Sequence, residues 1–293
     1  MKGGGWAVQQ SENKKTLLQK LQEIDPKWIY LIQLIVISYP LLYPLGLPLG
    51  TISSETRGLY SAIDALPEGS IVFHAVCMGP AAAAECQPSL EAILKHDLEK
   101  GHKLIFYTDQ APGIPYIEQA MQNVLGASKD HPDYGKLYVN IGYIPQTYTG
   151  FSAFAADLFF TGSDVYGNDL RSMEFFKDLP TKTASDFDFG ITYGSGNFQW
   201  IITYLSDPWG VTCGGGIAAG IAAEAYPFYP QKTPGFLVGL RGGAEYEVLI
   251  GKPGYAAAGM DAQSLAHLSI IIMVLIGNVA FLLSKMQGGM QKT

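Results

Sequence analysis

The sequence predicts a doubly wound α/β domain with a mostly parallel sheet, held between two transmembrane helices. Two apolar stretches, residues 28–49 and 264–284, contain no Asp, Glu, Lys or Arg. Each is long enough to cross a hydrocarbon core, which takes about 20 helical residues. Between them, short strand-like patterns alternate with longer helical ones, which is typical of parallel β-α-β units and indicates a Rossmann-like sheet.

These patterns divide the chain into five segments. We expect a tail with an amphipathic helix at residues 1–25, a transmembrane helix at 26–49 and a soluble α/β domain at 50–263. A second transmembrane helix follows at 264–285, and a short tail at 286–293 ends the sequence. The first apolar stretch is too long for a signal peptide and lacks a small-residue cleavage site, so we interpret it as an uncleaved anchor.

The charges predict which side of the membrane each segment occupies. Short lysine-rich flanks stay on the cytoplasmic side, so we expect both tails inside and the α/β domain outside the cell membrane. All but three of the 26 acidic residues lie in that domain, which disfavours a nucleic-acid partner. The lysines of the two tails are Lys2, Lys14, Lys15, Lys20, Lys27, Lys285 and Lys292.

The N-terminal tail carries the pattern of an amphipathic helix over residues 11–24. Ser11 is a suitable N-cap, and leucines gather on one face while lysines lie elsewhere. We interpret it as a helix lying on the inner leaflet, with a partner-binding or merely solvated helix as the alternative. Asp25 followed by Pro26 predicts that a new helix starts there.

The two apolar stretches contain polar residues and prolines that predict helix pairing. Prolines recur every four residues from position 40, so the first helix should kink or end near Ser38. His267 and Asn278 fall on one stripe of the second helix. We expect them to form hydrogen bonds with Gln33 or Ser38, or with another subunit. A proton or ion path is the alternative.

Five strands and seven helices are expected in the domain. The strand patterns are short and rich in β-branched and aromatic residues. The helices are longer, and the one at residues 88–100 should expose Glu91, Lys95, Asp97 and Glu99. The predicted strands are residues 70–77, 102–108, 136–143, 186–193 and 210–213, and the predicted helices are 54–66, 88–100, 114–125, 151–160, 198–205, 217–225 and 234–249.

Ligands of open parallel sheets bind at the carboxyl ends of the strands. Two glycine-rich loops there are expected to run directly into helices, whose N-terminal N–H groups favour an anion such as phosphate or carboxylate. Asp109 follows the second strand and is either a ribose ligand or a turn cap. Structural glycine for tight packing is the alternative for the loops. The candidate ligand-binding residues are Asp109, Gly194, Ser195, Gly196, Asn197, Gly214, Gly215 and Gly216.

Neither a catalytic set nor a metal motif emerges from the sequence, and the cofactor stays unknown. Ser195 and Cys213 are the only nucleophiles expected at strand ends, and neither sits in G-x-S-x-G. Cys77 and Cys86 are compatible with one disulfide or with two free thiols. His74 is expected in the core, whereas His96, His102 and His131 should flank surface turns.

These observations predict an assembly or ligand-binding subunit of a membrane complex, as a homo-oligomer or a larger assembly. Double tethering, the small residues at 214–225 and 239–244, and the lack of a catalytic set favour that function. The alternative is a membrane-tethered enzyme or sensor that binds an anionic small molecule at the glycine loops.

Overall fold

The computed structural model describes residues 24–126, 129–145, 147–196 and 198–290. The chain forms two compact units, one of Pro44–Met260 and one that combines Met1–Tyr43 with Asp261–Thr293. Because the described residues begin at residue 24, nearly all of the predicted amphipathic helix at residues 11–24 lies outside them.

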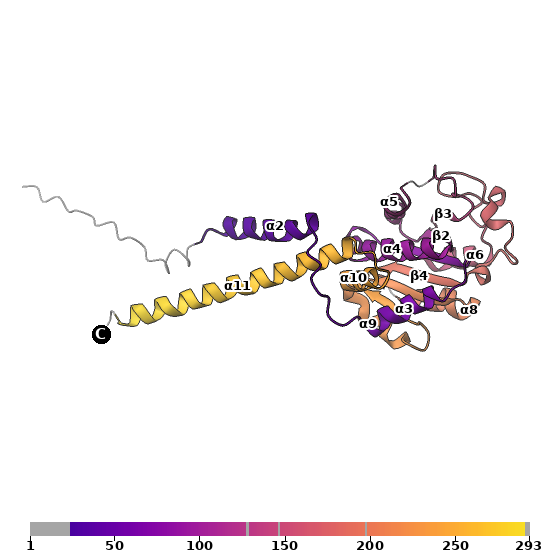
Figure 1. Cartoon of the computed structure of the whole chain (residues 1–293). Coiled ribbons are helices and arrows are strands. Elements are labelled where there is room, and N and C mark those ends of the chain that lie inside the picture. Colours follow the sequence, from indigo (N-terminus) through magenta and orange to yellow (C-terminus); the bar gives the residue numbers. More distant parts are fainter. Residues whose placement is uncertain (1–23, 127–128, 146, 197, 291–293) are drawn as a thin grey trace, which may run out of the picture. The chain divides into compact units, whose positions relative to one another are not determined.

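The larger unit is built on a six-stranded, all-parallel sheet, as expected for a Rossmann-like domain (Figure 1). The strand order is β3-β2-β1-β4-β5-β6, so the chain winds outward from β1 in one direction and then from β4 in the other. The strands are β1 Ile71–Cys77, β2 Lys103–Thr108, β3 Tyr138–Tyr143, β4 Phe189–Gly194, β5 Thr212–Ile217 and β6 Phe236–Val238.

Helices cover both faces of this sheet, as in other doubly wound folds. Side chains of α3, α4, α5 and α10 form the core on one face, and α6 with the segment after β4 forms it on the other. The helices are α3 Ser54–Asp64, α4 Pro80–Lys100, α5 Gly113–Leu125, α6 Thr147–Ala156, α7 Gln199–Ile201, α8 Asp207–Trp209, α9 Ala222–Ala225 and α10 Gly239–Leu249. A π-helix, Ile202–Ser206, joins α7 to α8, and short 3₁₀ turns occupy Leu170–Ser172, Glu174–Phe176, Ala184–Asp186, Ala219–Ile221 and Tyr226–Phe228.

Two predictions about the end of the sheet were wrong. Strand β5 does not stop at Cys213 but continues through Gly214, Gly215 and Gly216, so these glycines form no loop before a helix. A Cβ atom at Gly214 would lie 2.5 Å from Leu59, which explains the glycine by packing. The predicted helix at 234–249 also contains strand β6, whose three residues are too few to show an alternating pattern.

Helix α4 starts at Pro80, earlier than predicted, and buries charged residues that the sequence placed on its surface. Glu91 and Asp97 are buried, because α4 packs against both α5 and α10 as well as the sheet. Asp97 Oδ1 lies 2.8 Å from His102 Nδ1, and Asp97 Oδ2 lies 3.3 Å from His74 Nε2 without hydrogen-bond alignment. His96 is likewise buried and bonded to Tyr246, so the surface positions predicted for His96 and His102 were wrong.

Burial alone would raise the pKa of Asp97, but the neighbouring His102 and His74 outweigh it and lower the pKa below its usual range. Because the folded-state pKa is lowered, this carboxylate stabilises the fold above its unfolded pKa of about 3.9. That contribution is lost as the pH falls through the lower folded-state pKa.

Helix α10 holds both ends of the α/β domain through two buried carboxylates. Glu245 accepts hydrogen bonds from the backbone N–H and the hydroxyl of Ser53, at 3.1 and 2.8 Å. Glu247 accepts the N–H groups of Gly254, Ala256 and Ala257 at 2.8–3.1 Å. The residues before α3 and the first turn of α11 are therefore fixed to the same helix.

The second unit contains the apolar helix α2 and most of the apolar helix α11, whose first residues, 255–260, belong to the larger unit. In the described residues, α11 (Tyr255–Met290) is the one helix long and apolar enough to cross a membrane, over Tyr255–Leu283. Helix α2 spans only Pro26–Leu42, about 26 Å at 1.5 Å per residue, so it is shorter than the apolar stretch and ends four residues after the expected end near Ser38. Asp25 is its N-cap, as expected, and the helix continues through Pro40 before it ends.

A polar contact joins these two helices. Gln33 accepts a hydrogen bond from Ser269 at 3.0 Å and donates one to the Met273 sulfur at 3.8 Å. Ser38 is half-buried, whereas His267 and Asn278 are exposed on α11. Gln33 thus contributes to helix pairing through Ser269 and Met273 and not through the two polar residues expected from the sequence.

We expect the substitution Gly58→Ala to destabilise the domain by about 1–3 kcal/mol. The added Cβ atom would lie 2.0 Å from the Pro234 carbonyl oxygen, although alanine normally stabilises a helix interior relative to glycine. Gly220→Ala, where nothing lies within 4 Å of the new atom, is the control. Urea unfolding of the full chain in detergent measures both, and equal stabilities would contradict this packing.

Candidate functional site

The candidate site lies where the winding direction of the sheet changes, between the carboxyl ends of β1 and β4. Ligands of open α/β sheets bind at this switch point. Cys77, the last residue of β1, pairs with Gly194, the last residue of β4. A Cβ atom at Gly194 would lie 2.1 Å from the Cys77 carbonyl oxygen, so only glycine permits this approach. Asp109 follows the neighbouring strand β2, and Gly196 follows β4.

Register places a row of side chains across one face of the sheet at this edge. Ala75 pairs with Tyr107 on one side and with Thr192 on the other. The next row contains Cys77 and, across Gly194, Ile217. The small residues in the middle of both rows leave room between the larger side chains around them.

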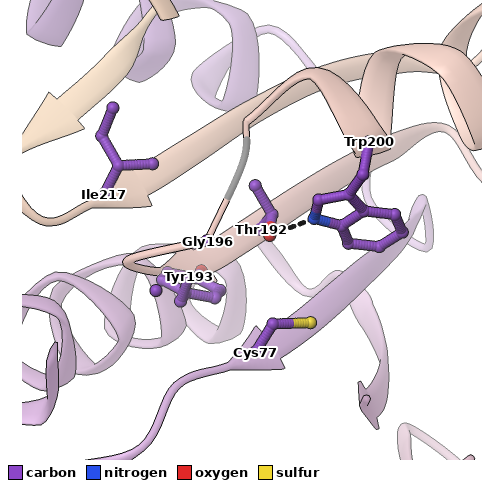
Figure 2. Close-up of a pocket in the computed structure, with 7 residues that line it drawn as sticks. Cys77, Thr192, Tyr193, Gly196, Trp200 and Ile217 are labelled. Atoms are coloured by element: carbon purple, nitrogen blue, oxygen red, sulfur yellow. Dashed lines mark hydrogen bonds between the residues drawn. The ribbon is translucent and has the colours of Figure 1, made fainter. Parts of the chain in front are cut away.

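A cavity of about 10 Å³, the space of one water molecule, occupies this edge (Figure 2). The indole N–H of Trp200 donates a hydrogen bond to Thr192 Oγ1 at 3.3 Å, as the dashed line in Figure 2 shows. Trp200 comes from α7, the short helix that follows β4, and is buried. The cavity is lined by Cys77, Thr192, Tyr193, Gly194, Gly196, Trp200 and Ile217.

Two polar atoms near Cys77, which lines this cavity, are buried and have no hydrogen-bond partner among the described residues. They are the Tyr107 hydroxyl and Asp109 Oδ1. Burial, with the nearby Cys77 and Asp109, raises the pKa of Tyr107, so its hydroxyl is a neutral donor. Buried polar atoms almost always bond to protein, water or ligand. A water molecule or a ligand would supply the hydrogen bonds that these two atoms lack.

The Cys77 thiol next to these groups is held protonated. Burial raises its pKa, and the carboxylate of Asp109 raises it further. A thiol is a weak nucleophile because its reactivity depends on the thiolate. The geometry therefore fits a neutral hydrogen-bonding wall better than a nucleophilic centre.

A larger pocket of about 240 Å³ adjoins the cavity, and Trp200 lines both. The rings of Tyr148 and Tyr204 stack in its wall, with centroids 4.8 Å apart and planes 14° apart. Tyr204 belongs to the π-helix, a form that often occurs at functional sites. Gln199 and Thr203 complete the wall.

Three of the predicted residues lie at this edge: Asp109, Gly194 and Gly196. Ser195 is exposed in the loop after β4, and Asn197 lies outside the described residues. The three predicted glycines of the second loop lie inside β5 instead. A Cβ atom added at Gly214, Gly215 or Gly216 would contact the side chain of Leu59, Phe198 or Tyr193, respectively. These glycines do not form the predicted loop.

Sequence reasoning missed Tyr107, Thr192, Trp200 and Tyr148. The alternation within β2 and β4 was a usable signal for the first two, since it places Tyr107 and Thr192 on one sheet face. The aromatic pocket had no such signal, because it depends on the π-helix.

Within residues 24–290, apart from the short undescribed gaps, no group of three His, Cys, Asp or Glu side chains could hold a metal ion. Comparison with known proteins found no matching family model, no similar curated protein and no similar solved structure.

All three cysteines should resist alkylation in the folded protein. They are free and buried, and burial raises the pKa of Cys86 to about 12 and that of Cys213 above its usual range as well. We expect no labelling by iodoacetamide at about pH 8, where an ordinary thiol of pKa about 8.5 reacts. Mass spectrometry should find three labels after denaturation without reductant. One label would indicate a disulfide, and rapid native labelling would contradict the buried thiols.

Proposed function

We propose that this protein is a membrane-anchored ligand-binding protein whose α/β domain holds a small molecule between the ends of β1 and β4. The observation that carries the proposal is the pair of unpartnered buried atoms, Tyr107 Oη and Asp109 Oδ1, near Cys77 in a cavity that shares Trp200 with the aromatic pocket. A largely apolar pocket with a few convergent polar groups is the usual form of a small-molecule site.

The lining favours a flat ligand without negative charge. Tyr148 and Tyr204 offer a stacked aromatic wall, against which a ring system would pack. The loops at residues 78–80, 109–113, 195–199 and 218–221 contain no Lys or Arg, whereas Asp109 adds a carboxylate. This charge pattern supports a neutral ligand over the anion that glycine loops alone would favour.

Assembly and turnover are the alternatives. The glycines of α10 that would favour assembly pack inside the domain, since Gly242 faces Leu237 and Gly243 faces Ser89 and Ala256. Turnover has less support because the Cys77 thiol is held protonated. A sensor that passes ligand binding across the membrane stays compatible with the same site.

Membrane anchoring is supported by the long exposed apolar helix α11. We place both tails in the cytoplasm and the α/β domain outside, because of the lysines in the tails.

A protease added to intact cells should cut within residues 50–263. The reason is that the acidic domain faces outward in this topology. Immunoblotting with a tag after residue 293 measures the fragment, and lysed cells are the control for accessibility. Complete protection on intact cells together with cleavage after lysis would reverse the proposed orientation.

Neutral 2-naphthol should bind the full chain in lipid nanodiscs more tightly than 2-naphthoate, which has the same rings and a negative charge. Tyr148→Ala should weaken the binding of 2-naphthol at least about tenfold, because one stacked ring is lost. Equilibrium dialysis, with empty nanodiscs as the blank, measures both ligands.

Tyr226→Ala is the matched control, since Tyr226 and Tyr148 are 47% and 48% exposed. Tighter binding of 2-naphthoate would favour the anionic alternative. Without saturable binding of either compound, the ligand-binding proposal fails and assembly becomes the leading function.

A further inference from the structure

A second pocket, of about 290 Å³, lies on the opposite face of the sheet, against α4 and α5. Amide and carboxylate side chains contribute half of its lining residues, and Tyr255 lines it as well. Tyr255 is the first residue of α11 and is exposed. The polar lining consists of Gln87, Glu91, Gln119 and Asn123.

Glu91 is a buried carboxylate without a cation. It is only 4% exposed, and no Lys, Arg or His among the described residues forms an ion pair with it. Its hydrogen bonds come from neutral amides, Asn123 Nδ2 at 2.8 Å and Gln87 Nε2 at 3.3 Å, and both end on Oε1. Burying a carboxylate is costly unless a positive charge compensates it.

Gln87 supplies an independent sign of a missing partner. Its Nε2 donates to both Glu91 and the Tyr116 carbonyl oxygen, which fixes the orientation of the amide. The opposite orientation would point the amide oxygen at two acceptors. Gln87 Oε1 is therefore an acceptor that is buried and unpartnered among the described residues, and it belongs to a side chain that lines the pocket and is 9% exposed.

We infer that this pocket binds a small organic cation that carries N–H donors, such as an alkylguanidinium or alkylammonium ion. The charge would pair with Glu91, an N–H would bond to Gln87 Oε1, and the ring of Tyr255 would face the cation. The inference is independent of the proposed function, because it concerns different residues on the other face of the sheet. A bound cation would also touch the first residue of α11.

Titration of the full chain in nanodiscs with n-butylguanidinium tests this inference, with isothermal calorimetry as the measurement. We expect saturable binding in about the millimolar range or tighter. Tetramethylammonium, a cation without N–H donors, and neutral n-butanol should bind at least about tenfold more weakly, because neither satisfies both acceptors.

Glu91→Gln should weaken n-butylguanidinium binding at least about tenfold, since it removes the charge. Glu99→Gln removes a charge from the exposed side of the same helix and should leave the affinity unchanged. Tyr255→Leu, at an exposed position, gives a second readout if Glu91→Gln does not fold, and should weaken binding several-fold.

Equal binding by the wild type and a folded Glu91→Gln variant would overturn the inference. So would the absence of saturable binding to the wild type, or equal binding of n-butanol and n-butylguanidinium. Loss of 2-naphthol binding in Tyr148→Ala with unchanged n-butylguanidinium binding would separate the two sites.

Discussion

Two buried carboxylates on helix α10 hold the chain segments at the two ends of the α/β domain. Glu245 and Glu247 are almost fully buried, and each is stabilised because backbone N–H groups donate to it. Their positions depend in turn on Gly242 and Gly243, which let α10 approach β6 and α4 closely. A larger side chain at either glycine would shift the helix and with it both sets of hydrogen bonds.

The parallel sheet was predictable because its central strands are continuous apolar runs separated by helical patterns. The burial of helix side chains by neighbouring helices could not be predicted. Helix α4 lies between α5 and α10, so residues on its flanks, such as Glu91 and Asp97, are buried although their spacing is that of a surface. The glycines of β5 were misread for a related reason: in this strand they make room for Leu59, Phe198 and Tyr193.

The location of the candidate site followed from the sequence more readily than its chemistry did. The rule that ligands bind at strand ends pointed to the edge where Asp109 and Gly194 lie. The identity of the lining depends on which sheet face each side chain occupies and on the aromatic residues of the segment after β4. A π-helix changes the helical period there, so the meeting of Tyr204 with Tyr148 leaves no regular pattern in the sequence.

The strand order has a consequence for synthesis of the chain. β1 pairs early with β2, but its other neighbour is β4, and the bond between Asp188 and Ile71 joins residues 117 positions apart. Until β4 is made, one side of β1 is an open edge of a strongly apolar strand, which is a template for aggregation. Sheets with such distant pairings fold slowly. A nascent chain of this protein thus depends on protection of that edge over more than a third of its length.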